Sequence, residues 1–139
     1  MFPFMKKLLP LFAMLSLFSS LVAADVPTLT PAAAAKLVAD GKAVLIDVRE
    51  PSEWAETGVA APALLLPKSE FDAGQVGDWK DFLAKVGDKQ IILYCRSGRR
   101  SGTVAEALAA KGHKAANAGP FEAWKAAGLP TRQPTEPAK

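Results

Sequence analysis

The sequence contains a single cysteine, Cys95, and a single histidine, His113. One cysteine cannot form an internal disulfide, and one cysteine with one histidine gives too few ligands for a zinc site, so no metal is expected. His113 follows Gly112 at the expected end of a helix and is interpreted as a surface residue; no cysteine–histidine arrangement for acyl transfer is evident. Cys95 is therefore either an inert core thiol or a residue kept for chemistry, and its neighbours decide between the two.

The first 24 residues differ in composition from the rest of the chain. Two lysines precede an apolar stretch over Leu8–Phe18, and small residues over 19–24 end in Val-Ala-Ala. This pattern predicts a secretory signal peptide over 1–24 that is cleaved after Ala24, rather than an uncleaved anchor helix. We therefore expect a periplasmic protein with no stable membrane association after cleavage.

Charge and length limit the partners and the domain count. Removing the signal peptide takes two lysines from a chain of net charge +3, so the mature protein is close to neutral. Outside the segment that follows Cys95 the sequence has no aromatic-rich basic stripe, so nucleic acid is not expected as a partner. The remaining length suits one domain, expected over 25–131 and as a monomer. The proline-rich segment 132–139 offers no core residues and is predicted to be a disordered tail.

Apolar runs alternate with helical patterns along the mature chain. This alternation predicts an α/β single domain with a mostly parallel central sheet and helices on both faces. Thr30 and Pro31 indicate the start of the first helix, which ends before Gly41. The expected strands are 43–48, 63–67, 90–95 and, more weakly, 114–118. The other expected helices begin at Pro51, within 76–88, near Ser101 and within 120–128.

Cys95 ends the third expected strand, and a short loop follows it. Ligands of α/β sheets bind outside the carboxyl ends of the strands. A glycine in such a loop lets backbone N–H groups converge, and the next helix adds its positive end, so both favour a thiolate. Three arginines could hold an oxyanion. The candidate substrate-binding residues around the nucleophile are Arg96, Ser97, Gly98, Arg99, Arg100 and Ser101.

Sulfur transfer fits a site that has a thiolate and anion stabilisation but no dedicated base. A thiolate attacks the outer sulfur of an anion such as thiosulfate, and sulfite departs without needing a proton. The resulting persulfide passes its sulfur to cyanide or to a thiol. No cofactor is expected for this reaction.

Three motifs give the chain a resemblance to the rhodanese family of sulfurtransferases. They are "CRSGRRS" at 95–101, "DVREPSEWAETG" at 47–58 and "PFEAWKAAGLP" at 120–130, in family order across 28–131. The resemblance implies that Cys95 carries the persulfide and that the backbone of 96–100 cradles the transferred sulfur. It also implies polar contacts by Asp47 and Arg49, which we expect to be structural support. Val59 and Pro62 replace the histidine and glycine usual in the family.

Two alternatives remain open. Phosphatases and arsenate reductases of the same fold resemble Cys-x5-Arg, whereas the last loop arginine here, Arg100, gives Cys-x4-Arg. Phosphate-ester cleavage also needs a general acid, which the loop does not supply. The second alternative is a module without fast turnover. The intact Cys95 counts against a pure interaction module, whereas a sulfur carrier would keep this cysteine. We therefore favour a thiosulfate sulfurtransferase.

Overall fold

A computed structural model describes residues 25–139. The predicted signal peptide over 1–24 lies outside the described residues. Within the described part, no helix is long and apolar enough to cross a membrane.

Four parallel strands form the central sheet, in the order β3-β1-β4-β5. They are β1 (Ala43–Asp47), β3 (Leu64–Leu65), β4 (Gln90–Cys95) and β5 (Ala115–Pro120). The strands predicted at 43–48 and 90–95 are confirmed almost to the residue. β4 lies inside the sheet, and its run Ile91–Leu93 is fully buried because both faces of the sheet are covered.

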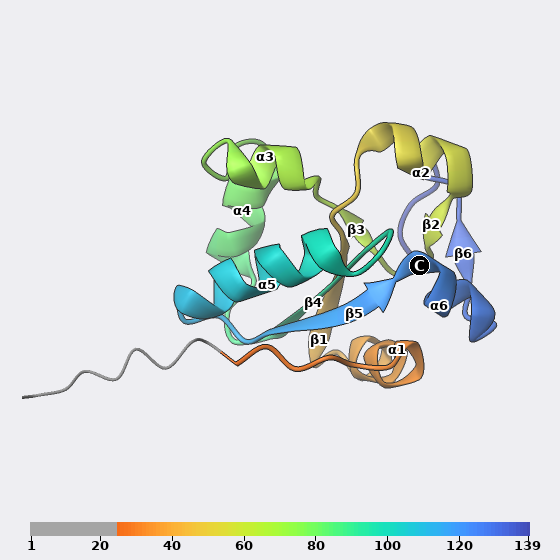
Figure 1. Cartoon of the computed structure of the whole chain (residues 1–139), viewed down its shortest axis with the longest axis horizontal. Helices are drawn as coiled ribbons and strands as arrows, with labels where there is room; N and C mark the ends of the chain where they lie inside the picture. The colour runs from red at the N-terminus through yellow and green to blue at the C-terminus, as the bar shows by residue number, and fades with distance from the viewer. Residues whose placement is uncertain (1–24) are drawn as a thin grey trace, which may run out of the picture.

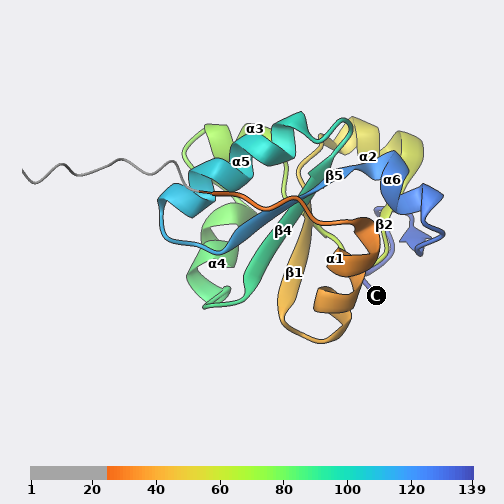
Figure 2. The same cartoon turned by 60° about the horizontal axis from the view of Figure 1, so that its bottom comes forward.

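Helices cover both faces of the sheet, as predicted (Figures 1 and 2). Alternate strand residues such as Ile91 and Leu93 pack with α4 (Asp78–Lys85) and α5 (Arg99–Ala110). Their neighbours, including Ile92, pack with α1 (Pro31–Ala39) and α6 (Phe121–Ala126). Alternation of side chains along a strand therefore builds one core on each face.

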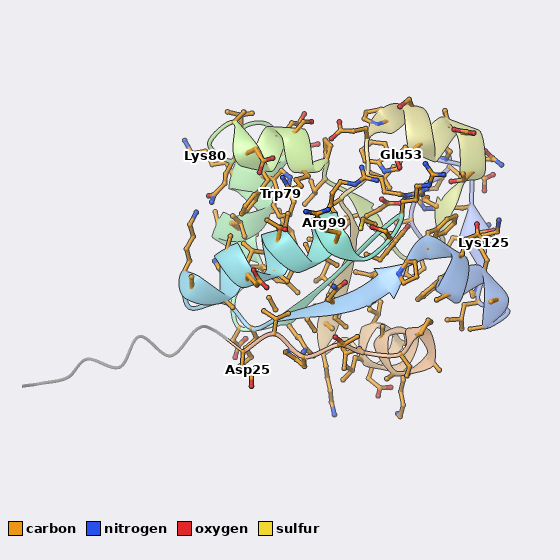
Figure 3. All side chains as sticks on the ribbon, viewed as in Figure 1. Asp25, Glu53, Trp79, Lys80, Arg99 and Lys125 are labelled. Atoms are coloured by element: carbon orange, nitrogen blue, oxygen red, sulfur yellow. The ribbon has the colours of Figure 1, made fainter. Side chains whose placement is uncertain are left out.

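Hydrogen bonds from single side chains define the start of α1 and the position of α4. Thr30 caps α1, because its hydroxyl accepts a hydrogen bond from the Ala33 N–H at 3.2 Å. Trp79 of α4 is fully buried (Figure 3) and donates to the Pro67 carbonyl at 2.9 Å. This contact ties α4 to α3 (Lys68–Asp72), a short helix that the sequence did not predict.

The C-terminal segment 132–139, predicted to be disordered, is instead held against the domain. β6 (Thr131–Arg132) pairs antiparallel with β2 (Val59–Ala60). The buried Arg132 guanidinium donates to the carbonyls of Ala61 at 3.0 Å and Ala63 at 2.6 Å. The N–H of Lys139 also donates to Ala61 at 2.8 Å. The tail prediction was wrong because it considered only apolar anchors, whereas the buried Arg132 guanidinium and a backbone hydrogen bond hold this segment to the carbonyls of Ala61 and Ala63.

Candidate active site

Cys95 lies at the carboxyl end of β4, where the chain turns into α5. Its side chain is fully buried, and α5 begins at Arg99, two residues earlier than predicted. Gly98 makes this turn with φ of 92°, in the left-handed region. A Cβ on Gly98 would lie 3.2 Å from the Cα of Gly119, so the turn requires glycine for both its conformation and its close contact with β5.

Hydrogen bonds converge on the Cys95 sulfur. The Gly98 N–H donates to Sγ at 3.0 Å, and the Ser101 hydroxyl lies 3.4 Å from it. Burial opposes ionisation of the thiol, but hydrogen bonds from the Ser101 hydroxyl and from the backbone of Ser101, Gly98 and Ser97 outweigh it and lower the pKa of Cys95. The loop can therefore stabilise a negatively charged sulfur at this position.

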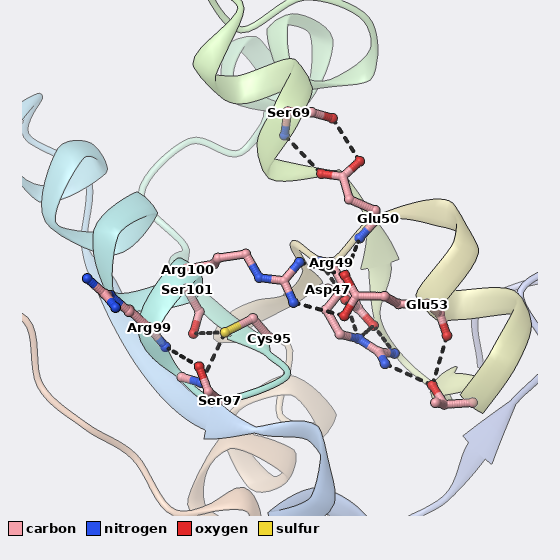
Figure 4. Close-up of polar contacts among 12 residues, drawn as sticks. Asp47, Arg49, Glu50, Glu53, Ser69, Cys95, Ser97, Arg99, Arg100 and Ser101 are labelled. Carbon is pink, nitrogen blue, oxygen red and sulfur yellow. Dashed lines mark hydrogen bonds and ion pairs between the residues drawn. The ribbon is translucent and has the colours of Figure 1, made fainter.

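Arg100 of α5 pairs with Glu53 of α2 (Pro51–Thr57), beside Cys95 (Figure 4). Its two terminal nitrogens lie 2.6 and 2.8 Å from the Glu53 carboxylate oxygens. Hydrogen bonding to Arg100 lowers the pKa of Glu53 to about 2. The same carboxylate accepts from the Glu50 N–H at 3.2 Å and completes a capping box. This ion pair was not predicted from the sequence.

Asp47, the last residue of β1, and Arg49 form a buried ion pair. The Arg49 guanidinium donates to Asp47 Oδ2 at 2.8 Å and also to the Thr57 hydroxyl and the Gly58 carbonyl. It lies 4.4 Å from the centre of the Phe121 ring. The pair thus joins the end of β1 to both α2 and α6, and both of these helices flank the Cys95 loop.

The other loop residues face outward. Arg96, Ser97 and Arg99 are exposed, and the Ser97 hydroxyl accepts from the Arg99 N–H at 3.3 Å. Arg96 lines a pocket of about 250 Å³ beside the loop. The other residues around this pocket are Arg49, Glu53, Glu56, Thr57, Phe121 and Glu122. The pocket borders the loop through Arg96.

Asn117 of β5 is a site residue that the sequence reading missed. Its Nδ2 donates to the Gly98 carbonyl at 2.8 Å, and its Oδ1 accepts from the Ser101 hydroxyl at 2.8 Å. The available signal was a polar side chain in the weak strand "KAANA", at the strand end that meets the loop. Among residues 25–139, no group of three or more potential ligands could hold a metal ion.

A family model for the rhodanese-like domain matches residues 30–127. The chain is 33% identical over 81 residues to a putative mitochondrial thiosulfate sulfurtransferase of Schizosaccharomyces pombe, covering 54% of this chain and 56% of that protein. The chain spans little more than half the length of the first curated relatives that it matches.

Solved structures show the same fold. A human single-domain sulfurtransferase matches with a TM-score of 0.57 at 28% identity, covering 73% of this chain and 97% of that one. A Rhodopseudomonas palustris protein of unknown function, described as a possible tyrosine phosphatase, matches with a TM-score of 0.65 at 27% identity, covering 77% and 85%. With three motifs in family order, a cysteine loop at the end of β4 and a family model spanning most of the chain, this protein belongs to the rhodanese-like domain family.

Proposed function

We propose that this protein is a thiosulfate sulfurtransferase that works through a persulfide on Cys95. The observation that carries the proposal is the set of donors on one sulfur, with the Gly98 N–H at 3.0 Å and the Ser101 hydroxyl at 3.4 Å. Donors in fixed positions stabilise a thiolate before the reaction, and a persulfide anion after it. The sulfurtransferases among the relatives support the same reaction class.

The reaction proceeds in two displacement steps. The Cys95 thiolate attacks the outer sulfur of thiosulfate, the sulfur–sulfur bond of thiosulfate breaks, and sulfite leaves with the electron pair. Cys95 then carries a persulfide with one negative charge. In the second step cyanide or a thiolate attacks the terminal sulfur, and the Cys95 thiolate is restored. Neither step needs a protonated leaving group, in agreement with the absence of an evident general acid in the loop.

The arginines of the loop differ in their availability to the donor anion. Arg100 is already paired with Glu53, so much of its charge is neutralised inside the site. Arg96 and Arg99 are exposed, and Arg96 also lines the pocket beside the loop. We therefore assign the first electrostatic contact with thiosulfate to Arg96, and the holding of the transferred sulfur to the backbone donors.

A phosphatase is the second candidate, and the possible tyrosine phosphatase among the structural relatives favours considering it. The loop here has four residues between Cys95 and Arg100, one fewer than phosphatases of this fold use. In addition, Arg100 donates both of its terminal nitrogens to Glu53, which leaves it poorly placed to clamp a phosphoryl group. A sulfur carrier without fast turnover is the third candidate.

One set of assays separates these candidates. Protein lacking residues 1–24 is supplied with thiosulfate and cyanide, and thiocyanate is measured; parallel samples receive an aryl phosphate. The proposal expects thiocyanate formation that Cys95→Ala abolishes, and no phosphate release. Turnover of the aryl phosphate without thiocyanate overturns it in favour of a phosphatase. A persulfide that forms but does not turn over supports a carrier.

Export and a monomeric state belong to the same proposal. The basis for export is the pattern of the first 24 residues, and the basis for a monomer is the small size of the domain. Expression of the full chain in a bacterium with a periplasm should yield a periplasmic protein that begins close to Asp25. Recovery of the uncut chain in the cytoplasm would contradict export, and light scattering measures the oligomeric state.

A further inference from the structure

Asn117 joins β5 to Gly98 and Ser101, two residues that hydrogen-bond to the Cys95 sulfur. Its Nδ2 donates to the carbonyl of Gly98, and its Oδ1 accepts from the hydroxyl of Ser101, each at 2.8 Å. The same Oδ1 accepts from the Gly119 N–H at 2.9 Å. One carbonyl and one N–H of the main chain are thus bound at opposite ends of the amide, so only one orientation of the amide satisfies both.

The backbone of Asn117 is held as firmly as its side chain. Its N–H donates to the Pro27 carbonyl and its carbonyl accepts from the Leu29 N–H, both at 2.9 Å. On the other side, Asn117 is opposite Leu93 in the pairing of β5 with β4. The amide therefore extends from an anchored strand toward the loop.

The Ser101 hydroxyl has two acceptors but only one proton. Its oxygen lies 2.8 Å from Asn117 Oδ1 and 3.4 Å from Cys95 Sγ. Because a hydroxyl donates one hydrogen bond at a time, a proton directed at Asn117 is not directed at the sulfur. Ser101 is fully buried, which leaves water little room to act as a third partner.

We propose that Asn117 is a positioning residue that controls the direction of the Ser101 hydroxyl proton, and through it the hydrogen bonding received by the Cys95 sulfur. This inference rests on the proposed role of Cys95 as the nucleophile. While Cys95 is an uncharged thiol, Asn117 is the better acceptor. When the sulfur carries negative charge, the proton turns to Sγ, and Asn117 Oδ1 keeps its bond from Gly119.

Two roles for Asn117 predict different effects on the pKa of Cys95. Asn117 could only hold the loop in place, or it could compete with the sulfur for the Ser101 proton. Loosening the loop would displace the donors from Sγ, so every change at Asn117 would make the thiolate harder to form. A competing acceptor predicts opposite effects. A stronger acceptor at this position takes the proton away from the sulfur, whereas removing the acceptor leaves the proton to the sulfur.

Two substitutions separate these cases, with the pH dependence of Cys95 alkylation by iodoacetamide as the measurement. Asn117→Asp has the same size and a stronger, charged acceptor, so the midpoint should move to higher pH. Asn117→Ala has no acceptor, so the midpoint should move to lower pH. Each shift should be about half a pH unit or more. Asn117→Val, which suits a strand, removes the same acceptor and replaces Asn117→Ala if that variant does not fold.

The charged groups around the Cys95 loop are left unchanged by these substitutions. Arg100 of α5 interacts electrostatically with Cys95 and with Glu53 and Glu50 of α2 and its start. The remaining charges are the Asp47–Arg49 pair at the end of β1 and the exposed Arg96 and Arg99 of the loop. Only the Asp variant introduces a charge of its own. The neutral variants therefore report the loss of the acceptor alone.

The route through Ser101 is tested in a Ser101→Ala background. There the hydroxyl is absent, so Asn117→Ala should no longer move the alkylation midpoint. Shifts in the same direction for Asn117→Asp and Asn117→Ala, no shift in either, or an undiminished Asn117→Ala shift in the Ser101→Ala background would each overturn the proposal. Alkylation needs no sulfur donor, so the inference and the proposed sulfurtransferase activity can fail independently.

Discussion

Arg100 and Glu53 form a bidentate ion pair that joins α5, which follows the Cys95 loop, to α2, which follows β1. The nitrogen–oxygen distances are 2.6 and 2.8 Å, and both side chains are partly exposed. The arginine that the sequence placed among the substrate-binding residues therefore also fixes the position of α2 over the site.

This ion pair should make stability depend on acid pH. The pKa of Glu53 falls from 4.5 to about 2 in the folded protein, with the hydrogen bond from Arg100 as the largest cause. A lowered folded pKa contributes stability above pH 4.5 that is lost as the pH falls toward 2. Because the pair is partly exposed, we expect the contribution to be about 1 kcal/mol. Urea unfolding of the wild type and Glu53→Gln across this range measures it; equal slopes against pH would contradict the assignment.

The Ser101 hydroxyl should be needed for the reactivity of Cys95, and the Ser97 hydroxyl should not. Ser101→Ala removes a hydroxyl that donates to the sulfur, so the pKa of Cys95 should rise, by about one unit for a bond worth about 1.4 kcal/mol. The Ser97 hydroxyl accepts from the Arg99 N–H instead. Ser97→Ala is therefore the matched control, with a nearly unchanged alkylation profile. Cys95 is the only thiol, so alkylation reports this residue alone. Equal shifts in the two variants would be inconsistent with the hydrogen bonding described.

A side chain should destabilise the protein more at Gly98 than at Gly112, a second glycine of similar conformation. The φ values are 92° at Gly98 and 94° at Gly112, but only at Gly98 would a Cβ meet another backbone, at 3.2 Å. Gly112→Ala should cost about 1 kcal/mol for the left-handed conformation. Gly98→Ala should cost more, about 2–3 kcal/mol, and should also slow sulfur transfer. Denaturant unfolding gives the first comparison and thiocyanate formation the second. The same cost at both positions would argue against the close contact.

Arg132 should stabilise the domain despite its place near the end of the chain. Arg132→Met keeps much of the length but leaves the carbonyls of Ala61 and Ala63 without these donors. A loss of about 2–3 kcal/mol in the free energy of unfolding is expected. The exposed Lys125 offers a control, since Lys125→Met should change stability by less than about 0.5 kcal/mol. A tail without stable contacts would give similarly small effects for both variants.

The sequence predicted those parts of the fold that depend on local pattern. Continuous apolar runs identify β1 and β4, because strands covered on both faces need them, and Thr30 with Pro31 marks the start of α1. The position of Cys95 follows from the end of its run. The missed features depend on contacts between distant residues, such as Arg132 with Ala61, Arg100 with Glu53, and Asn117 with Gly98 and Ser101. In each of them the tertiary fold, and not the local sequence pattern, brings a polar side chain next to its hydrogen-bond partner.

The most direct test of the account is the mass of the protein after exposure to thiosulfate. Protein lacking residues 1–24 is incubated with excess thiosulfate, separated from it, and measured intact by mass spectrometry before and after addition of cyanide. The account predicts a gain of one sulfur atom, located on Cys95, that cyanide removes as thiocyanate and that Cys95→Ala does not show. A wild-type protein that folds, exposes its thiolate to iodoacetamide and yet gains no sulfur would contradict it.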